Sequence, residues 1–441
     1  MSEFKYIIFF VVLFIGVPFN YILARKYVHY EKFLWFLLIF FTANMVDINF
    51  ISMETYRGSS KGFEIGMVDI VVFSMLAVVI GRKDEHPLKI PPGTTLFFLY
   101  FFFSLVSIIN SDVLVYSFFE IWKMTRMYIF FFVVYNMIRK FEEFDDLMLI
   151  ISFITLYITI IVLKQKYMLG IFQAYGPFPH QNSLVMYMIV FGALLLAYLL
   201  NNNKIKLFYW LMIFGAAGID IIATLSRGGM ALFAFSTSII FLFSYTNKMS
   251  FRKLGITLIF IILASGVLYK ASDTILERVK TAPTESVDVR VALAKAAQNM
   301  ANDKFFGIGL NNFGLKINPP YPYANHIERK DEYEKGGLVE TIYLMIAAET
   351  GWHNLGVFVV LLLYFYVKNI RNYFRMKGSI YRYIPLALIA ALSSVYVQST
   401  LEWVLKQTNN FYQLMFIFAI IGVVSRLLDK KDEEDEKKEM S

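Results

Sequence analysis

The chain has 441 residues, of which 58% are hydrophobic and 18% aromatic, and its mean hydropathy is +0.56. Only 17% of the residues are charged, against about 25% in soluble globular proteins, which excludes that class and indicates a polytopic integral membrane protein. The formal net charge of +8 is scattered among predicted loops, so nucleic acid is not an expected partner. The chain contains no cysteine, which excludes disulfides and thiol chemistry.

Apolar runs of about 20 residues recur along the chain, and a run of this length is typical of a transmembrane helix. We expect an all-α polytopic membrane protein with about 12 to 14 such helices. The expected spans are residues 6–23, 33–51, 66–81, 94–110, 113–138, 147–163, 184–201, 205–224, 228–244, 253–270, 338–367, 383–400 and 411–428. The first run lacks a small-residue cleavage site, so we expect a membrane helix there and not a signal peptide.

Lysine and arginine are concentrated in alternate connections, and this pattern predicts the orientation in the membrane. The segments expected on the cytoplasmic side are ARKYVHYEK, GRKDEHPLK, IRKFEEFDD, NNKIK, NKMSFRK, KNIRNYFRMKGSIYR and the C-terminal tail. The remaining connections are expected to face outward, among them the turn SRG and a long loop from 271 to 337. The unusual polar segments therefore gather on the outer face.

This topology divides the chain into four predicted parts. They are the first ten expected transmembrane helices (1–270), the outer-face loop (271–337), three further transmembrane helices (338–428) and a charged cytoplasmic tail (429–441). Apolar residues recur at helical spacing within the loop, which predicts a short helix on the membrane surface. These residues are Val289, Leu293, Ala296, Ala297 and Met300. The glycines of the following segment FGIGLNNFG are expected to end that helix.

The stretch TLSRGGMALFAF places a permanent cation, Arg227, between two apolar runs. One interpretation is an arginine at a helix end that reaches to the membrane interface. The other is an anion site, because the Gly-Gly pair leaves backbone N–H groups open at a helix start, where a guanidinium can help to hold a phosphate. Arg278, Lys280 and Arg290 leave a similar choice, between attraction to lipid headgroups and a second clamp on a diphosphate.

Glu340 begins the apolar run ETIYLMIAAETGW, where a carboxylate is costly unless it is paired or exposed to water. It is either a charge matched to the helix dipole or a general base. Glu349 lies near an expected helix break at Gly351, and we predict a structural role for it. His353, directly after that break, is expected at the interface.

Other polar residues have less specific interpretations. His180 and His326 lie in expected outer loops, and because no second ligand follows at metal-binding spacing, no metal site is expected. The residues Glu120, Lys123 and Arg126 recur on one helix face, which predicts an intrahelical ion pair facing the bundle interior. Four further carboxylates are candidates for burial with no assigned role: Asp47, Asp69, Asp220 and Glu402.

The motifs GPFPHQN, TLSRGGMALF, ALAKAAQNMANDKFFGIGLNNFG and ETIYLMIAAETGWHNLGVF occur in an order that resembles the O-antigen ligase and O-antigen polymerase superfamily of membrane glycosyltransferases. The resemblance extends from about Arg57 to Glu402. It implies a helical GT-C-type fold, no cofactor or metal, and a saccharide donor carried on undecaprenyl diphosphate at the outer face of the bacterial inner membrane. It also implies that Arg227 and Arg290 hold the diphosphate, with Arg278 as a further candidate. Family ligases typically carry His-Asn where this chain has Glu340 and Thr341.

Transfer from a glycosyl diphosphate needs cations for the departing diphosphate and a base near the acceptor hydroxyl. Glu340 is the candidate catalytic base. The candidate sugar or acceptor contacts are His180, His326, Tyr343 and Glu402. The loop tyrosines Tyr321, Tyr323 and Tyr333 could offer platforms for sugar rings, although tyrosine is also common at membrane interfaces.

The leading hypothesis is a polymerase that joins lipid-linked repeat units of O antigen, capsule or exopolysaccharide, with a chain-length-regulating co-polymerase as a candidate partner. One alternative is a ligase that transfers finished glycan to lipid A core or another acceptor. A second is a transporter, but transporters usually have paired repeats and helices broken at the membrane midplane, whereas the unusual charges here lie at the ends of spans. A third, a structural membrane subunit, leaves the Arg227 turn unexplained. Membrane lipids are the remaining expected partner.

Overall fold

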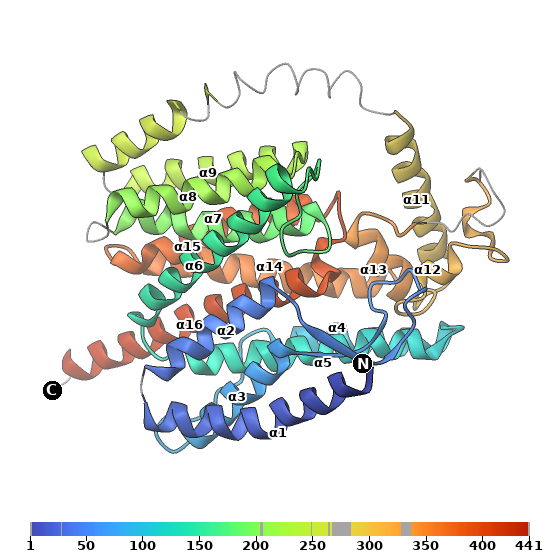
Figure 1. Ribbon diagram of the computed structural model, residues 1–441, viewed down its shortest axis with the longest axis horizontal. Helices are drawn as coiled ribbons and strands as arrows, with labels where there is room; N and C mark the ends of the chain where they lie inside the picture. Colours follow the sequence, from blue (N-terminus) through green and yellow to red (C-terminus); the bar gives the residue numbers. More distant parts are fainter. Residues whose placement is uncertain are drawn as a thin grey trace.

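The computed structural model describes residues 2–27, 29–202, 206–247, 249–262, 265–266, 284–327 and 337–439. Most of the described chain is helical, and Figure 1 shows the long helices running lengthwise in one bundle. Within the described residues, 7 helices are long and apolar enough to cross a membrane, and shorter apolar helices accompany them at Met67–Gly81, Thr94–Asn110 and Leu207–Ala223. The predicted all-α polytopic membrane fold is confirmed.

The helices follow the expected spans closely in most of the chain. The first half of the bundle contains α1 (Ser2–Lys26), α2 (Tyr30–Ala43), α3 (Met67–Gly81), α4 (Thr94–Val106), α5 (Leu114–Met137) and α6 (Glu143–Leu163). The second half contains α7 (Gln181–Asn201), α8 (Leu207–Ala223), α9 (Arg227–Asn247), α14 (Trp352–Arg375), α15 (Tyr383–Gln398) and α16 (Thr408–Glu439). A further helix is described at 251–262, and the rest of the span expected there lies largely outside the described residues. The last helix, α16, continues through most of the predicted charged tail.

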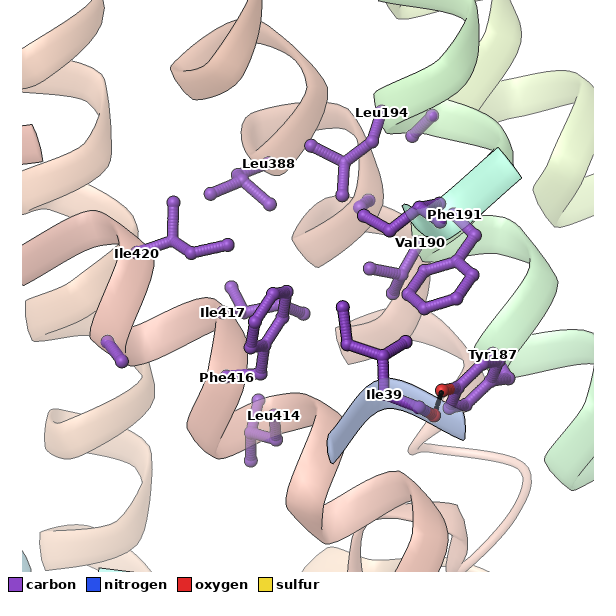
Figure 2. Close-up of a cluster of buried hydrophobic side chains, with 14 of the residues drawn as sticks. Ile39, Tyr187, Val190, Phe191, Leu194, Leu388, Leu414, Phe416, Ile417 and Ile420 are labelled. Atoms are coloured by element: carbon purple, nitrogen blue, oxygen red, sulfur yellow. Dashed lines mark hydrogen bonds between the residues drawn. The ribbon is translucent and has the colours of Figure 1, made fainter. Parts of the chain in front are cut away.

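Helix α7 forms the centre of the bundle because its sequence is apolar on every side. Its apolar segment is completely buried, and it packs against α8, α9 and α15. Figure 2 shows Val190 and Leu194 of α7 in one cluster with Leu388 of α15 and Ile417 of α16. In the same cluster the Tyr187 hydroxyl lies 3.4 Å from the backbone oxygen of Ile39 on α2. This contact joins α7 to α2.

One expected span is wrong in its last part. Helix α2 ends at Ala43, and strand β1 (Asp47–Ser52) pairs antiparallel with β2 (Gly62–Gly66). Polar and large apolar residues alternate in DINF, which is the period of a strand. The hairpin is anchored where the Trp122 indole donates to the backbone oxygen of Glu64 at 2.7 Å. The predicted helix of 33–51 is thus replaced by a helix and a hairpin.

The span expected at 338–367 is divided in two. Helix α13 (Ile342–Thr350) ends at Gly351, whose φ is +88°, and α14 begins at the next residue. The predicted break at Gly351 is confirmed. A helix, α11 (Thr284–Asp303), is present where a surface helix was predicted, and its place at the membrane surface stays a prediction. It is followed by the short α12 (Phe313–Lys316), and both lie at one end of the bundle, to the right in Figure 1.

Ion pairs join several of the lysine- and arginine-rich connections at the opposite end. They are Lys32–Asp146 at 2.8 Å, Arg139–Glu31 at 2.7 Å, Arg375–Asp429 at 2.7 Å and the close pair Arg82–Glu31. Alternate connections therefore meet at the same end, as the charge pattern predicted. The assignment of that end to the cytoplasm stays a prediction.

Candidate active site at the end of the bundle

Five polar residues from distant parts of the chain are connected at the end of the bundle that carries α11. We call this group the carboxylate–arginine site and define it as Asn182, Ser226, Arg290, Glu340 and Glu402. They come from the start of α7, the turn between α8 and α9, α11, the segment before α13 and the segment after α15.

The turn between α8 and α9 presents Ser226 and Arg227. Ser226 caps α9, because its Oγ accepts a hydrogen bond from the backbone N–H of Gly229 at 3.2 Å. A Cβ on Gly229 would lie 2.7 Å from a methyl carbon of Val185, so glycine lets α9 begin close against α7. Arg227 is the first residue of α9, and its side chain is exposed.

Asn182 connects this turn to a carboxylate. His180 caps α7 by accepting a hydrogen bond from the Asn182 backbone N–H at 3.2 Å. The Asn182 side chain accepts from the Ser226 hydroxyl at 3.2 Å and donates to Glu402 Oε1 at 2.5 Å. Gln398 on α15 donates to the Asn182 backbone oxygen at 3.0 Å. The amide therefore has a fixed orientation between the arginine turn and Glu402.

Arg290 lies between two carboxylates. Its guanidinium forms a close ion pair with Glu340 and lies 3.6 Å from Glu402 Oε1. The Arg290 side chain is 47% exposed, whereas those of Glu340 and Glu402 are 33% and 16% exposed. The cation is thus reachable from outside, and the two acids lie deeper.

Burial controls the protonation of both acids. Desolvation raises the pKa of Glu340, although the Arg290 charge opposes the shift. The pKa of Glu402 rises to about 7, because burial and the nearby Glu340 charge together outweigh the opposing effect of Arg290. Glu402 is therefore close to half-protonated near neutral pH, where a carboxylate can accept and return protons.

Two residues that were predicted to contact the sugar or acceptor, His326 and Tyr343, lie outside the carboxylate–arginine site. The His326 ring Nε2 lies 2.9 Å from the backbone oxygen of Ala292 on α11, and the side chain is exposed. The Tyr343 hydroxyl donates to the backbone oxygen of Tyr396 at 3.1 Å and so joins α13 to α15. Arg278, Lys280 and Tyr333 lie outside the described residues.

A second group of charged side chains is buried in the fold. The predicted pair within α5 is confirmed, with Lys123 Nζ 2.8 Å from Glu120. Lys406, just after Glu402 in the chain, is 2.5 Å from Glu349 and 3.9 Å from Glu120. All four side chains are at most 5% exposed. This buried network joins α5, α13 and the segment that carries Glu402.

Other polar residues that were singled out in the sequence lie elsewhere in the fold. Arg126 pairs with Asp69 of α3 at 2.7 Å and not within its own helix. Asp220 is buried and accepts a hydrogen bond from Thr159 at 2.9 Å. Asp47 is only partly buried, in β1. The His353 ring stacks on Phe305, with centroids 4.9 Å apart.

Sequence reasoning missed Asn182, Ser226 and Lys406. Asn182 and Ser226 stand inside the motifs GPFPHQN and TLSRGGMALF, but their neutral side chains gave no charge signal. Lys406 is charged, yet it occurs in an expected outer connection where a lysine is usually solvated. The contact between residues 182 and 402 joins segments more than 200 positions apart, which no local pattern reveals.

The fold and site define a polytopic membrane protein with a polar site, an arginine between two carboxylates, at one end of its helices. Residues 210–359 match the O-antigen ligase family, a segment that runs from α8 into α14 and includes Arg227, Arg290 and Glu340. This match confirms the resemblance that the sequence motifs indicated. No curated protein sequence matches the chain.

Proposed function

We propose that the protein is a metal-independent glycosyltransferase of the inner membrane. In this proposal it joins undecaprenyl-diphosphate-linked oligosaccharide repeat units into a cell-surface polysaccharide, with its active site facing outward. The observation that carries the proposal is the connected group in which Arg290 contacts Glu340 and Glu402, and Asn182 links Glu402 to the Arg227 turn. Such a group offers cations and a proton acceptor in one place.

The two arginines are proposed to bind the diphosphate of the donor. Arg227 is exposed at the first turn of α9, where the helix dipole also favours an anion. Arg290 is half-exposed and contacts carboxylates, so the diphosphate would replace them as its partner. A guanidinium can bind phosphate oxygens with two parallel hydrogen bonds, and Arg278 is a further candidate.

The proposed reaction is a direct displacement at the anomeric carbon. The acceptor hydroxyl oxygen bonds to that carbon as the bond to the diphosphate oxygen breaks, and the hydroxyl proton passes to Glu340. Undecaprenyl diphosphate leaves with the electron pair, and the arginines stabilise its negative charge. Attack opposite the leaving group inverts the anomeric configuration.

Glu402 is proposed to assist this step as a neighbouring acid. Its raised pKa of about 7 lets it share a proton with Glu340 at neutral pH. His180, His326 and Tyr343 remain candidate contacts for sugar or acceptor, of which His180 is nearest in the chain to Asn182.

A ligase is the second candidate function, because the matched family carries that description. The glutamate at position 340, where family ligases have histidine, favours the polymerase. Deletion of the gene in its native strain distinguishes the two. A polymerase mutant accumulates single repeat units on undecaprenyl diphosphate, and a ligase mutant accumulates long chains on that lipid. A deletion strain with unchanged surface glycan and no accumulated lipid-linked sugar would overturn both.

A further inference from the structure

Helix α14 carries an apolar stripe that ends in a cluster of basic residues. Val360, Leu363 and Val367 are 44% to 50% exposed, although they belong to a helix long and apolar enough to cross a membrane. On adjoining helical positions toward the C-terminal end stand Lys368, Arg371 and Arg375. An apolar stripe that runs into cations matches the order of acyl chain and headgroup in a lipid leaflet.

A cleft of about 600 Å³ lies along this stripe. Residues from three helices line it, among them Leu96 of α4, Val360, Leu363, Lys368 and Arg371 of α14, and Asp429 of α16. Its apolar wall is formed by Leu96 and the α14 stripe, and its polar wall lies toward the end of the bundle opposite to the carboxylate–arginine site. The cleft is therefore separate from the proposed catalytic machinery.

The protein balances the positive charges in the cleft only in part. Arg375 pairs with Asp429 and Asp432, each at 2.7 Å, so the acid that lines the cleft is already engaged. Among the residues that the structure describes, the side chains of Lys368 and Arg371 form no hydrogen bond or ion pair, although the charge of Asp429 acts on Lys368. Two cations beside an apolar wall are complementary to a ligand with an anionic head and a hydrocarbon tail.

We propose that this cleft binds one anionic phospholipid of the surrounding leaflet. Lys368 and Arg371 contact the headgroup phosphate, and an acyl chain lies along Leu96, Val360 and Leu363. Anionic headgroups are attracted to basic pockets between transmembrane helices, and Arg371 adds the forked geometry that suits a phosphate. The site does not depend on the proposed glycosyltransferase activity.

The test uses the full-length protein in nanodiscs of phosphatidylcholine that contain a minor fraction of phosphatidylglycerol. Native mass spectrometry then counts the phosphatidylglycerol molecules that remain bound. We expect the double variant Lys368→Gln, Arg371→Gln to weaken retention of one such molecule by roughly 10- to 30-fold, on the general scale for two cations near an anionic headgroup. The matched control Lys431→Gln, Lys437→Gln removes the same charge from the exposed part of α16 and should retain lipid like the wild type.

A second readout locates the lipid independently of charge. Phosphatidylglycerol with a photoactivatable group on its acyl chain should label peptides containing Leu96 and residues 360–367, and the Lys368→Gln, Arg371→Gln variant should lose this label. Equal retention in that variant and the control would overturn the proposal. So would equal retention of phosphatidylcholine at the same position, uniform labelling of the lipid-facing helices, or a cross-link at the cleft to a second copy of the chain.

Discussion

Arg290 contacts Glu340 and the more deeply buried Glu402, and its own exposed side chain is the basis of its proposed role in binding the diphosphate. The exposed guanidinium is proposed to exchange its carboxylate partners for the diphosphate of the donor. Arg227 follows Ser226 at the start of α9, and Ser226 is linked to Glu402 through Asn182. The two cations belong to different elements, and each is proposed to contact a different phosphate of one donor.

We predict that Arg227→Ala and Arg290→Ala each abolish polysaccharide product while the protein remains in the membrane. Arg227→Lys should also be poor, because a point-charge ammonium does not reproduce the forked hydrogen bonding of a guanidinium. The matched control is Lys295→Ala, which removes an exposed cation from the same helix as Arg290. Product is measured by glycan electrophoresis and protein level by immunoblot. Normal polymer from the Arg227→Ala strain would contradict the diphosphate site.

The protonation of Glu402 leads to a prediction of pH dependence. Because its pKa is raised to about 7, the acid is mostly protonated below that pH and mostly ionised above it. If the ionised pair of acids receives the acceptor proton, the transfer rate should rise with pH through about 7 and level off above. Glu402→Gln should remove this inflection while the protein still binds the donor. A rate that stays flat from pH 6 to 8 in the wild type would contradict the assignment.

At the scale of helices, the sequence predicted the features that depend on neighbouring residues along the chain. The apolar run of α7, the break at Gly351 and the amphipathic α11 each follow from hydropathy or a single glycine, and all three are present. The β hairpin was missed because a short alternating segment next to an apolar helix reads as its continuation. The contacts of Asn182 and Lys406 were missed because they depend on how distant elements pack.

The buried network gives a prediction about the stability of these elements. Lys406→Met leaves Glu349 buried without its cation, and removal of one partner of a buried pair costs about 3–5 kcal/mol. Glu349→Gln should cost less, because Lys406 keeps Glu120 within 3.9 Å. The double variant Glu349→Gln, Lys406→Met should recover part of the loss. Thermal unfolding in detergent measures the order, and a Lys406→Met variant as stable as the wild type would contradict it.

For the whole molecule, the Lys/Arg pattern predicts the orientation in the membrane. Ion pairs join several of the lysine- and arginine-rich connections at one end of the bundle, and the carboxylate–arginine site lies at the other end. We therefore expect the loops at 139–146, 245–252 and 368–382 to face the cytoplasm and 271–337 to face outward. Reporter fusions at each loop test this topology. A fusion that places residue 300 in the cytoplasm would invert it.

Purified protein incubated with undecaprenyl-diphosphate-linked repeat units as the sole substrate tests the polymerase proposal most directly. We expect the wild type to produce a ladder of longer lipid-linked glycans and to release undecaprenyl diphosphate in the presence of a metal chelator. Glu340→Gln keeps the size of the side chain but does not accept the proton, so it should bind the donor and form no ladder. Transfer that occurs only after lipid A core is added, with no ladder from repeat units alone, would contradict the polymerase and favour a ligase.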